Sequence, residues 1–270
     1  METLKHPKGL KALFFTEMWE RMSYYGMRGI LVLFMTASIN DGGLNFNNAS
    51  ASAIYGIYAA SVYLATLPGG WIGDNILGQQ KTILYGGVII MFGHLSLAIP
   101  NINSFYIGLI LVVLGTGLLK PNISAIVGEL YENNPEMRQS GFTIFYMAIN
   151  LGSILGFFIC GYLGENIGWH YGFGAAGIGM AFGLIQYIYN IKLLEKSGAE
   201  PFNKINSETK SKYKKIILVS VGLIFLITIS GLLGLWNIDP VPFANILTIT
   251  IALISLFYFF YIFVFGGLNG

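Results

Sequence analysis

The chain has 270 residues, of which 54% are hydrophobic and only 10% are charged, and its formal net charge is +2. An ordinary soluble domain carries about 25% charged residues, so this composition excludes one. The single cysteine, Cys160, lies in an apolar stretch and excludes a disulfide framework. We expect neither a cofactor nor a nucleic-acid partner.

Eight apolar segments account for the composition. Each has about 18–27 residues, enough to cross a hydrocarbon core about 30 Å thick, and none alternates as a barrel strand does. Backbone groups in lipid must then be paired within helices. The sequence therefore predicts an all-α polytopic membrane protein in contact with the lipid bilayer. The predicted spans are Leu13–Ile39, Ala51–Ile72, Thr82–Ile99, Phe105–Leu130, Ser140–Leu163, Tyr171–Ile191, Ile216–Leu235 and Phe243–Phe265.

The cations are distributed unevenly among the connections between these spans. Residues 1–12, every second connection after them and the 192–215 stretch hold Lys and Arg, whereas residues 40–50, 100–104, 164–170 and 236–242 hold none. Positive residues remain on the cytoplasmic side during membrane insertion. We therefore predict a multi-pass protein of the cell (inner) membrane with both termini in the cytoplasm.

The first span carries an unusual polar face. Six residues recur at helical spacing and share one side of a helix: Glu17, Glu20, Arg21, Tyr24, Tyr25 and Arg28. Each charge costs about 2.5–3.5 kcal/mol within a membrane helix unless it meets another charge, water or a ligand. An ion-pair network that only orients helices is one interpretation. We favour a polar cavity in which the arginines bind a carboxylate and the glutamates titrate.

Other polar residues lie inside later spans. Lys120 precedes Pro121 deep in the fourth span, which predicts an anion or a wet cavity beside it. The proline frees a carbonyl one turn earlier. Asn150 in the fifth span has two open interpretations, a bond to a neighbouring helix or to a ligand. His94 is predicted to be a packed histidine with its ring nitrogens satisfied.

The connection after the second span, GWIGDNILGQQK at residues 70–81, has an acidic side chain at a helix exit and a glycine that turns the chain. We interpret Asp74 as a conformational latch, with a simple turn as the alternative.

Two glycine pairs, Gly152 with Gly156 and Gly179 with Gly183, have the spacing that lets membrane helices approach closely.

The chain divides into three parts. Residues 1–191 are predicted to form a six-helix bundle and residues 192–215 a basic, partly helical cytoplasmic linker. Residues 216–270 contain a helix pair without a charged residue inside its spans, predicted to face lipid. The lysines of the linker fit topology determination better than a lipid-binding switch.

Four motifs in order resemble the proton-dependent oligopeptide transporters, a branch of the major facilitator superfamily. They are EMWERMSYYG at 17–26, GLLKPNIS at 117–124, FTIFYMAINLG at 142–152 and GWHYGFGA at 168–175. The resemblance implies a six-helix bundle of a major facilitator fold followed by the helix pair that bacterial members insert between their halves.

The resemblance also assigns roles. It implies that Arg21, Tyr25, Lys120 and Asn150 contact the carboxyl end of a di- or tripeptide, and by spacing Tyr63 joins them. Arg28 is implied to pair with an acidic residue of the other half. The proton-coupling residues are implied to be Glu17 and Glu20.

There are two departures from the family pattern. The superfamily connection usually reads G-x-x-x-D-R-x-x-G-x-[R/K]-[R/K]; here Asn75 replaces its arginine, and Gln79 and Gln80 lower its charge. Family members also have six more spans, with carboxylates that face Arg28 and Lys120. We therefore expect a partial transporter, missing its C-terminal half, that binds peptide weakly and does not transport alone.

The predicted function is proton-coupled symport of di- and tripeptides by alternating access. A facilitator for another anion, such as nitrate or a small carboxylate, is the alternative, although an anion site gains nothing from adjacent glutamates. An enzyme is not expected, because no metal-ligand cluster, Ser/His/Asp set or phosphate-binding loop is present in the sequence.

Overall fold

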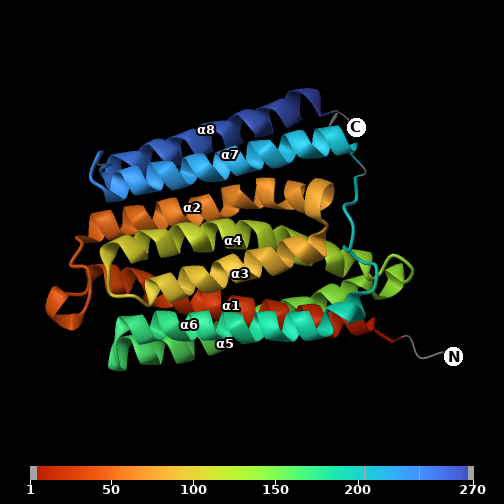
Figure 1. Cartoon of the computed structure of the whole chain (residues 1–270), viewed down its shortest axis with the longest axis horizontal. Helices are drawn as coiled ribbons and strands as arrows, with labels where there is room; N and C mark the ends of the chain where they lie inside the picture. The colour runs from red at the N-terminus through yellow and green to blue at the C-terminus, as the bar shows by residue number, and fades with distance from the viewer. Residues whose placement is uncertain (1–4, 204, 237, 267–270) are drawn as a thin grey trace.

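The computed structural model describes residues 5–203, 205–236 and 238–266. Eight long helices run back and forth along a common direction (Figure 1). Each predicted apolar segment is one of them, so the predicted all-α fold is confirmed. The helices are α1 Lys8–Thr36, α2 Asn48–Ile72, α3 Gln79–Leu97, α4 Ile102–Glu129, α5 Pro135–Asn166, α6 Trp169–Asn190, α7 Ser207–Leu232 and α8 Pro240–Phe265, with short turns η1 Ile39–Asp41, η2 Gly73–Leu77 and η3 Ile191–Leu194.

Short polar side chains start several of these helices. Asn47 accepts a hydrogen bond from the backbone of Ser50 at the start of α2, and Asn206 does the same for Thr209 at the start of α7. Such caps satisfy backbone N–H groups that have no partner in the first turn of a helix. Because Asn206 caps α7, residues 207–215 of the predicted linker belong to a helix. The non-helical part of the linker is shorter than residues 192–215.

Helix α1 lies inside the bundle. It packs along α5 and α6, α3 packs along α4 and α6, and α2 packs along α4. Helix α8 contacts α2 at the edge of the bundle, and α7 contacts η2. Neither α7 nor α8 has a buried residue among those described. The apolar side chains of α7 and α8 are therefore exposed on the outside of the chain.

Six of the helical segments are long and apolar enough to cross a membrane, and they include α2, α4, α5, α6, α7 and α8. Helices α1 and α3 run alongside them in the same bundle (Figure 1). The protein is thus a multi-pass membrane protein. The start of α1, the α2–α3 and α4–α5 connections and the end of α8 all lie at one end of the bundle, which we call the lysine-rich end.

Both predicted glycine pairs are helix contacts. A Cβ at Gly152 would lie 2.8 Å from the Cβ of Arg21, and one at Gly156 would lie 2.7 Å from the backbone N of Gly26. On α6, a Cβ at Gly179 would lie 2.5 Å from the sulfur of Met22. Real Cβ contacts are longer, because protein interiors are packed without spare space. The small residues therefore fix how closely α5 and α6 approach α1.

His94 differs from its predicted environment. It is fully buried, as expected, but neither ring nitrogen has a hydrogen-bond partner within the described part of the chain. The prediction of a satisfied ring was wrong. His94 is surrounded by apolar packing between α3 and its neighbours. The sequence pattern placed it inside the bundle but could not show what surrounds its ring.

The close approach of α1 and α5 can be tested with Gly156→Ala. The added methyl group would meet backbone atoms of Met22 and Gly26, which cannot move aside as a flexible side chain can. We expect the free energy of unfolding in detergent to fall by roughly 1–3 kcal/mol.

The matched control is Gly161→Ala on the same helix, where a Cβ meets nothing within 4 Å. Its stability should be unchanged or slightly higher, since alanine favours a helix by about 1 kcal/mol over glycine. Equal losses in the two variants would contradict the packing described.

Candidate functional site

Three charged residues are buried together on α1. The exposed fractions of Glu17, Glu20 and Arg21 are 2%, 0% and 2%. The Nε of Arg21 lies 3.2 Å from a Glu17 oxygen and donates a hydrogen bond to the Glu20 carboxylate. Two carboxylates therefore flank one guanidinium inside the bundle, so the three groups carry a net negative charge when all are ionised. Glu17 and Arg21 are four residues apart, the spacing at which side chains on a helix meet.

Aromatic rings complete this arrangement. The Arg21 guanidinium carbon lies 5.0 Å from the centre of the Tyr24 ring and 5.9 Å from that of Tyr25. A guanidinium above a ring face is attracted by the electron-rich π system. Sequence reasoning placed Tyr25 beside Arg21 and left Tyr24 without a role, although both lie one turn beyond the arginine.

The charged group is not fully satisfied. One oxygen each of Glu17 and Glu20 and the Nη2 of Arg21 have no hydrogen-bond partner among the described residues. A buried polar atom without a partner costs about 1–3 kcal/mol, and more when it is charged. The group therefore retains a donor and acceptors with which a ligand carboxylate or a proton could interact.

Lys120 on α4 approaches the same group. Its ammonium lies 5.1 Å from the centre of the Tyr63 ring on α2, and its charge acts on the Glu17 carboxylate. The structure thus brings Lys120 and Tyr63 together beside the buried charges of α1. Tyr63 is 59% exposed, so this side of the group opens to the surface of the chain.

The approach of α2 to α4 has a local cause. Pro121 lacks an N–H, which leaves the carbonyl of Gly117 free one turn earlier. Gly69 of α2 packs directly against that carbonyl, where any Cβ would clash. The Asn122 amide donates to the Gly69 oxygen at 3.0 Å. The motif around Lys120 therefore holds two helices together and positions the lysine.

Arg28 lies two turns further along α1. Its Nε donates to the hydroxyl of Tyr55 on α2, and its guanidinium carbon is 5.2 Å from the centre of that ring. Tyr55 was not singled out in the sequence. The i, i+3 spacing of Tyr55 and Tyr58, which places both on one face of the second span, was a signal for it.

Two predicted residues lie apart from this group. Asn150 is exposed on α5, and its amide donates to the carbonyl of Tyr146 in its own helix at 3.3 Å. Asp74 lies in η2 at the lysine-rich end, where the Gln79 amide donates to it at 3.2 Å. Among the described residues, no group of three His, Cys, Asp or Glu is arranged to hold a metal ion.

The sequence profile of the POT family matches residues 80–229. The chain belongs to the POT family. It is 44% identical to the uncharacterized transporter YclF of Bacillus subtilis over 96% of this chain and 52% of that protein. It is 42% identical to a di-/tripeptide transporter of Lactococcus lactis over 88% of this chain and 48% of that one.

Solved structures of the family agree. The chain is similar to peptide transporter POT in complex with sulfate, with a TM-score of 0.86 and 39% identity over 98% of this chain and 54% of that one. It is also similar to a POT family transporter in complex with a thioalcohol conjugated peptide, with a TM-score of 0.82 and 36% identity over 95% of this chain and 53% of that one. The chain spans about half the length of the relatives it matches.

The buried charges predict a specific response to mutation. Arg21→Met would leave two buried carboxylates without a cation, and we expect a loss of about 3–5 kcal/mol in the free energy of unfolding. The triple variant Glu17→Gln, Glu20→Gln, Arg21→Met removes every ionised group and should regain most of that loss. Denaturant unfolding in detergent measures both. A triple variant no more stable than Arg21→Met would show that the methionine packs badly and that charge is not the cause.

Proposed function

We propose that this chain forms the wall of a proton-coupled symporter of di- and tripeptides that binds the carboxyl end of the peptide. The main support is the buried Arg21. Its Nη2 has no hydrogen-bond partner among the described residues, two glutamates lie beside it, and Lys120 is near Glu17. The proposal places the protein in the cell (inner) membrane, with the lysine-rich end in the cytoplasm.

Binding follows from the cations. A peptide carboxylate would accept hydrogen bonds from the fork of Arg21 and from the Lys120 ammonium, since charge-assisted bonds are the strong ones. Tyr25 and Tyr63 lie beside these two cations and would line the site. Asn150, exposed on α5, would reach the peptide from the opposite side.

Proton coupling follows from competition. When a peptide carboxylate takes up the donors of Arg21, Glu17 and Glu20 lose part of their cation. A glutamate deprived of its cation binds a proton more readily. The proton then removes the charge that opposed movement of the helices, and the inward proton gradient sets the direction of transport.

The other half of the transporter completes the site in this proposal. Arg28, which bonds only a tyrosine hydroxyl here, would pair with an acidic residue of that half. Asp74 would act as a latch at the cytoplasmic end. Residues 1–191 would form the N-terminal bundle, followed by the linker and the inserted helix pair. The names of the Lactococcus relative and of the peptide-bound structure favour peptides over nitrate or a simple carboxylate.

Uptake of labelled dialanine into proteoliposomes under an inward pH gradient tests the proposal. The chain alone should show no uptake, because it supplies one wall. Joined to the second half of the Lactococcus lactis di-/tripeptide transporter, it should transport, and Lys120→Gln should lower uptake at least about tenfold, as expected for a lost charge-assisted bond.

The control is Lys212→Gln, which removes an exposed lysine on α7, outside the site. Its uptake should be unchanged. Competition by nitrate as effective as that by unlabelled dialanine, or full activity of Lys120→Gln, would contradict the proposal.

A further inference from the structure

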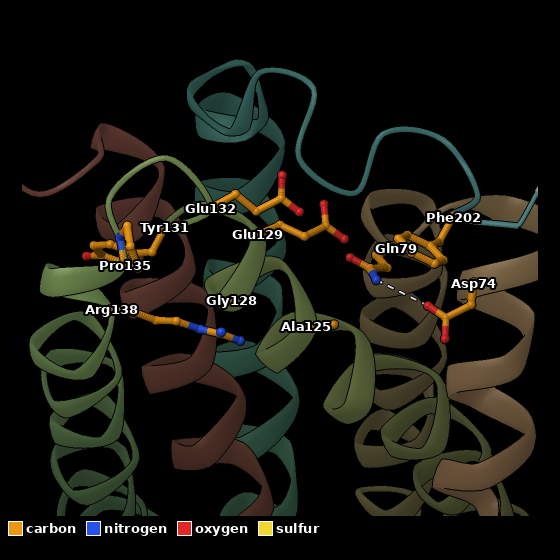
Figure 2. Close-up of a pocket in the computed structure, with 10 residues that line it drawn as sticks. All are labelled: Asp74, Gln79, Ala125, Gly128, Glu129, Tyr131, Glu132, Pro135, Arg138 and Phe202. Atoms are coloured by element: carbon orange, nitrogen blue, oxygen red, sulfur yellow. Dashed lines mark hydrogen bonds between the residues drawn. The ribbon is translucent and has the colours of Figure 1, made fainter.

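A second polar region lies at the lysine-rich end, away from the buried charges of α1. It is a cavity of about 500 Å³ whose polar lining includes Asp74, Gln79, Glu129, Glu132 and Arg138, with Phe202 at its edge (Figure 2). Glu129 is nine residues beyond Lys120 on α4, which is about 13 Å along the helix. The cavity is therefore separate from the proposed peptide site.

Among the described residues, no lysine or arginine forms an ion pair with the three carboxylates of this cavity. Asp74, Glu129 and Glu132 come from η2, the end of α4 and the α4–α5 connection, and Figure 2 shows Glu129 near Glu132, with Gln79 between Glu129 and Asp74. The ion pairs within the described residues all involve Arg21. Arg138 lies across the cavity, where its guanidinium packs over Gly128 and 5.9 Å from the centre of the Phe142 ring.

The buried side-chain amide of Gln79 lacks a hydrogen-bond donor for its oxygen among the described residues. Gln79 is 5% exposed and donates its amide N–H to Asp74, while its Oε1 has no partner among the described residues. Figure 2 shows this oxygen on the side of Glu129, whose carboxylate is close enough to interact with Gln79. Gln79 lies between two acceptors and has one NH₂ group. Its two N–H donors can serve Asp74 and the Glu129 carboxylate, so the Gln79 oxygen alone is left without a donor among the described residues.

The sequence of the connection explains the missing cation. Asn75 stands where the superfamily pattern has an arginine, directly after Asp74, and Gln80 stands at a basic position. The Asn75 amide donates instead to the carbonyl of Trp71. The connection therefore has one cation, Lys81, where the superfamily pattern has three basic positions.

The segment between η3 and α7 holds the Glu129 carboxylate and the backbone of Asp74 in place. The backbone N–H of Gly198 donates to Glu129 Oε2 at 2.7 Å, and that of Asn203 donates to the carbonyl of Asp74 at 2.9 Å. Gly198 has a positive φ of 67° and packs against Ile126 and Gln79. One oxygen of Glu129 is thus fixed by the backbone, which leaves the other for a ligand.

We propose that this cavity is a binding site for a small organic cation that carries a guanidinium or primary ammonium group. The cation donates to Glu129 and to the Gln79 oxygen, and Asp74 and Glu132 add negative charge around it. A guanidinium fits best, because its five N–H donors are spread in a plane and meet acceptors on several sides. The segment that carries Gly198 and Phe202 forms part of this site.

Isothermal titration of agmatine into the purified chain in detergent, at constant ionic strength, tests the proposal. We expect saturable binding of one agmatine per chain, tighter than that of putrescine. Glu129→Gln should weaken it at least about tenfold, because a charge-assisted hydrogen bond is lost. This variant keeps an oxygen that accepts from Gly198, so the segment should stay in place. Asn75→Arg, which supplies a tethered guanidinium beside Asp74, should also weaken binding.

The matched control is Glu165→Gln near the end of α5, an exposed glutamate at the opposite end of the bundle. Its affinity for agmatine should equal that of the unmodified chain. If agmatine gave no saturable heat with the unmodified chain, the proposal would be overturned. That is the result expected if Glu129 binds a proton, shared with the Gln79 oxygen, in place of an organic cation. Equal affinities of Glu129→Gln and Glu165→Gln would overturn it as well.

Discussion

The arrangement of this bundle depends on one arginine that is buried with two glutamates. Arg21 is 2% exposed in a chain made mostly of apolar helices, and its charge is balanced by Glu17 and Glu20 on the same helix. The high cost of an isolated charge in such surroundings requires α1 to lie inside the bundle, with α5 and α6 packed along it. Because its hydrogen bonding is incomplete, this group retains a donor and acceptors that can interact with a ligand or a proton.

Glycine makes this burial geometrically possible. Gly152 lies against the Cβ of Arg21, and Gly69 lies against the carbonyl that Pro121 leaves free. Without side chains at these positions, α5 covers the charged face of α1 and α2 reaches Lys120. The same residues that permit close packing thus decide which charges meet. In a POT family transporter whose halves move relative to each other, contacts of this kind would keep each half rigid.

The lysine-rich end is organised on a different principle. There the segment between η3 and α7 crosses the ends of α3 and α4 and is held by backbone hydrogen bonds to Asp74 and Glu129. Asn203 also donates to the side chain of Asn75, at 3.0 Å. The replacement of the superfamily arginine by asparagine therefore changes more than the charge of the connection. It also provides the acceptor to which the side chain of Asn203, from beyond the six-helix bundle, donates.

The sequence by itself determined the helical class, all eight helical segments and the residues of the charged group. Long apolar stretches require helices in lipid, and charges at helical spacing can survive burial only on one face. It also predicted both glycine pairs that contact α1, because small residues four apart have few other uses in a membrane helix.

Only the tertiary structure decided which side chains from different helices meet. Tyr55 bonds Arg28, the His94 nitrogens lack partners, and Asn150 faces outward from α5, because each outcome depends on the rotation of one helix against another. Helix α7 begins at Ser207 because Asn206 caps it, and the basic composition of residues 192–215 did not indicate this cap. The cavity around Glu129 joins residues far apart in the sequence. The residue pattern within one segment cannot predict a contact of this kind, because the contact forms only when separate segments pack together.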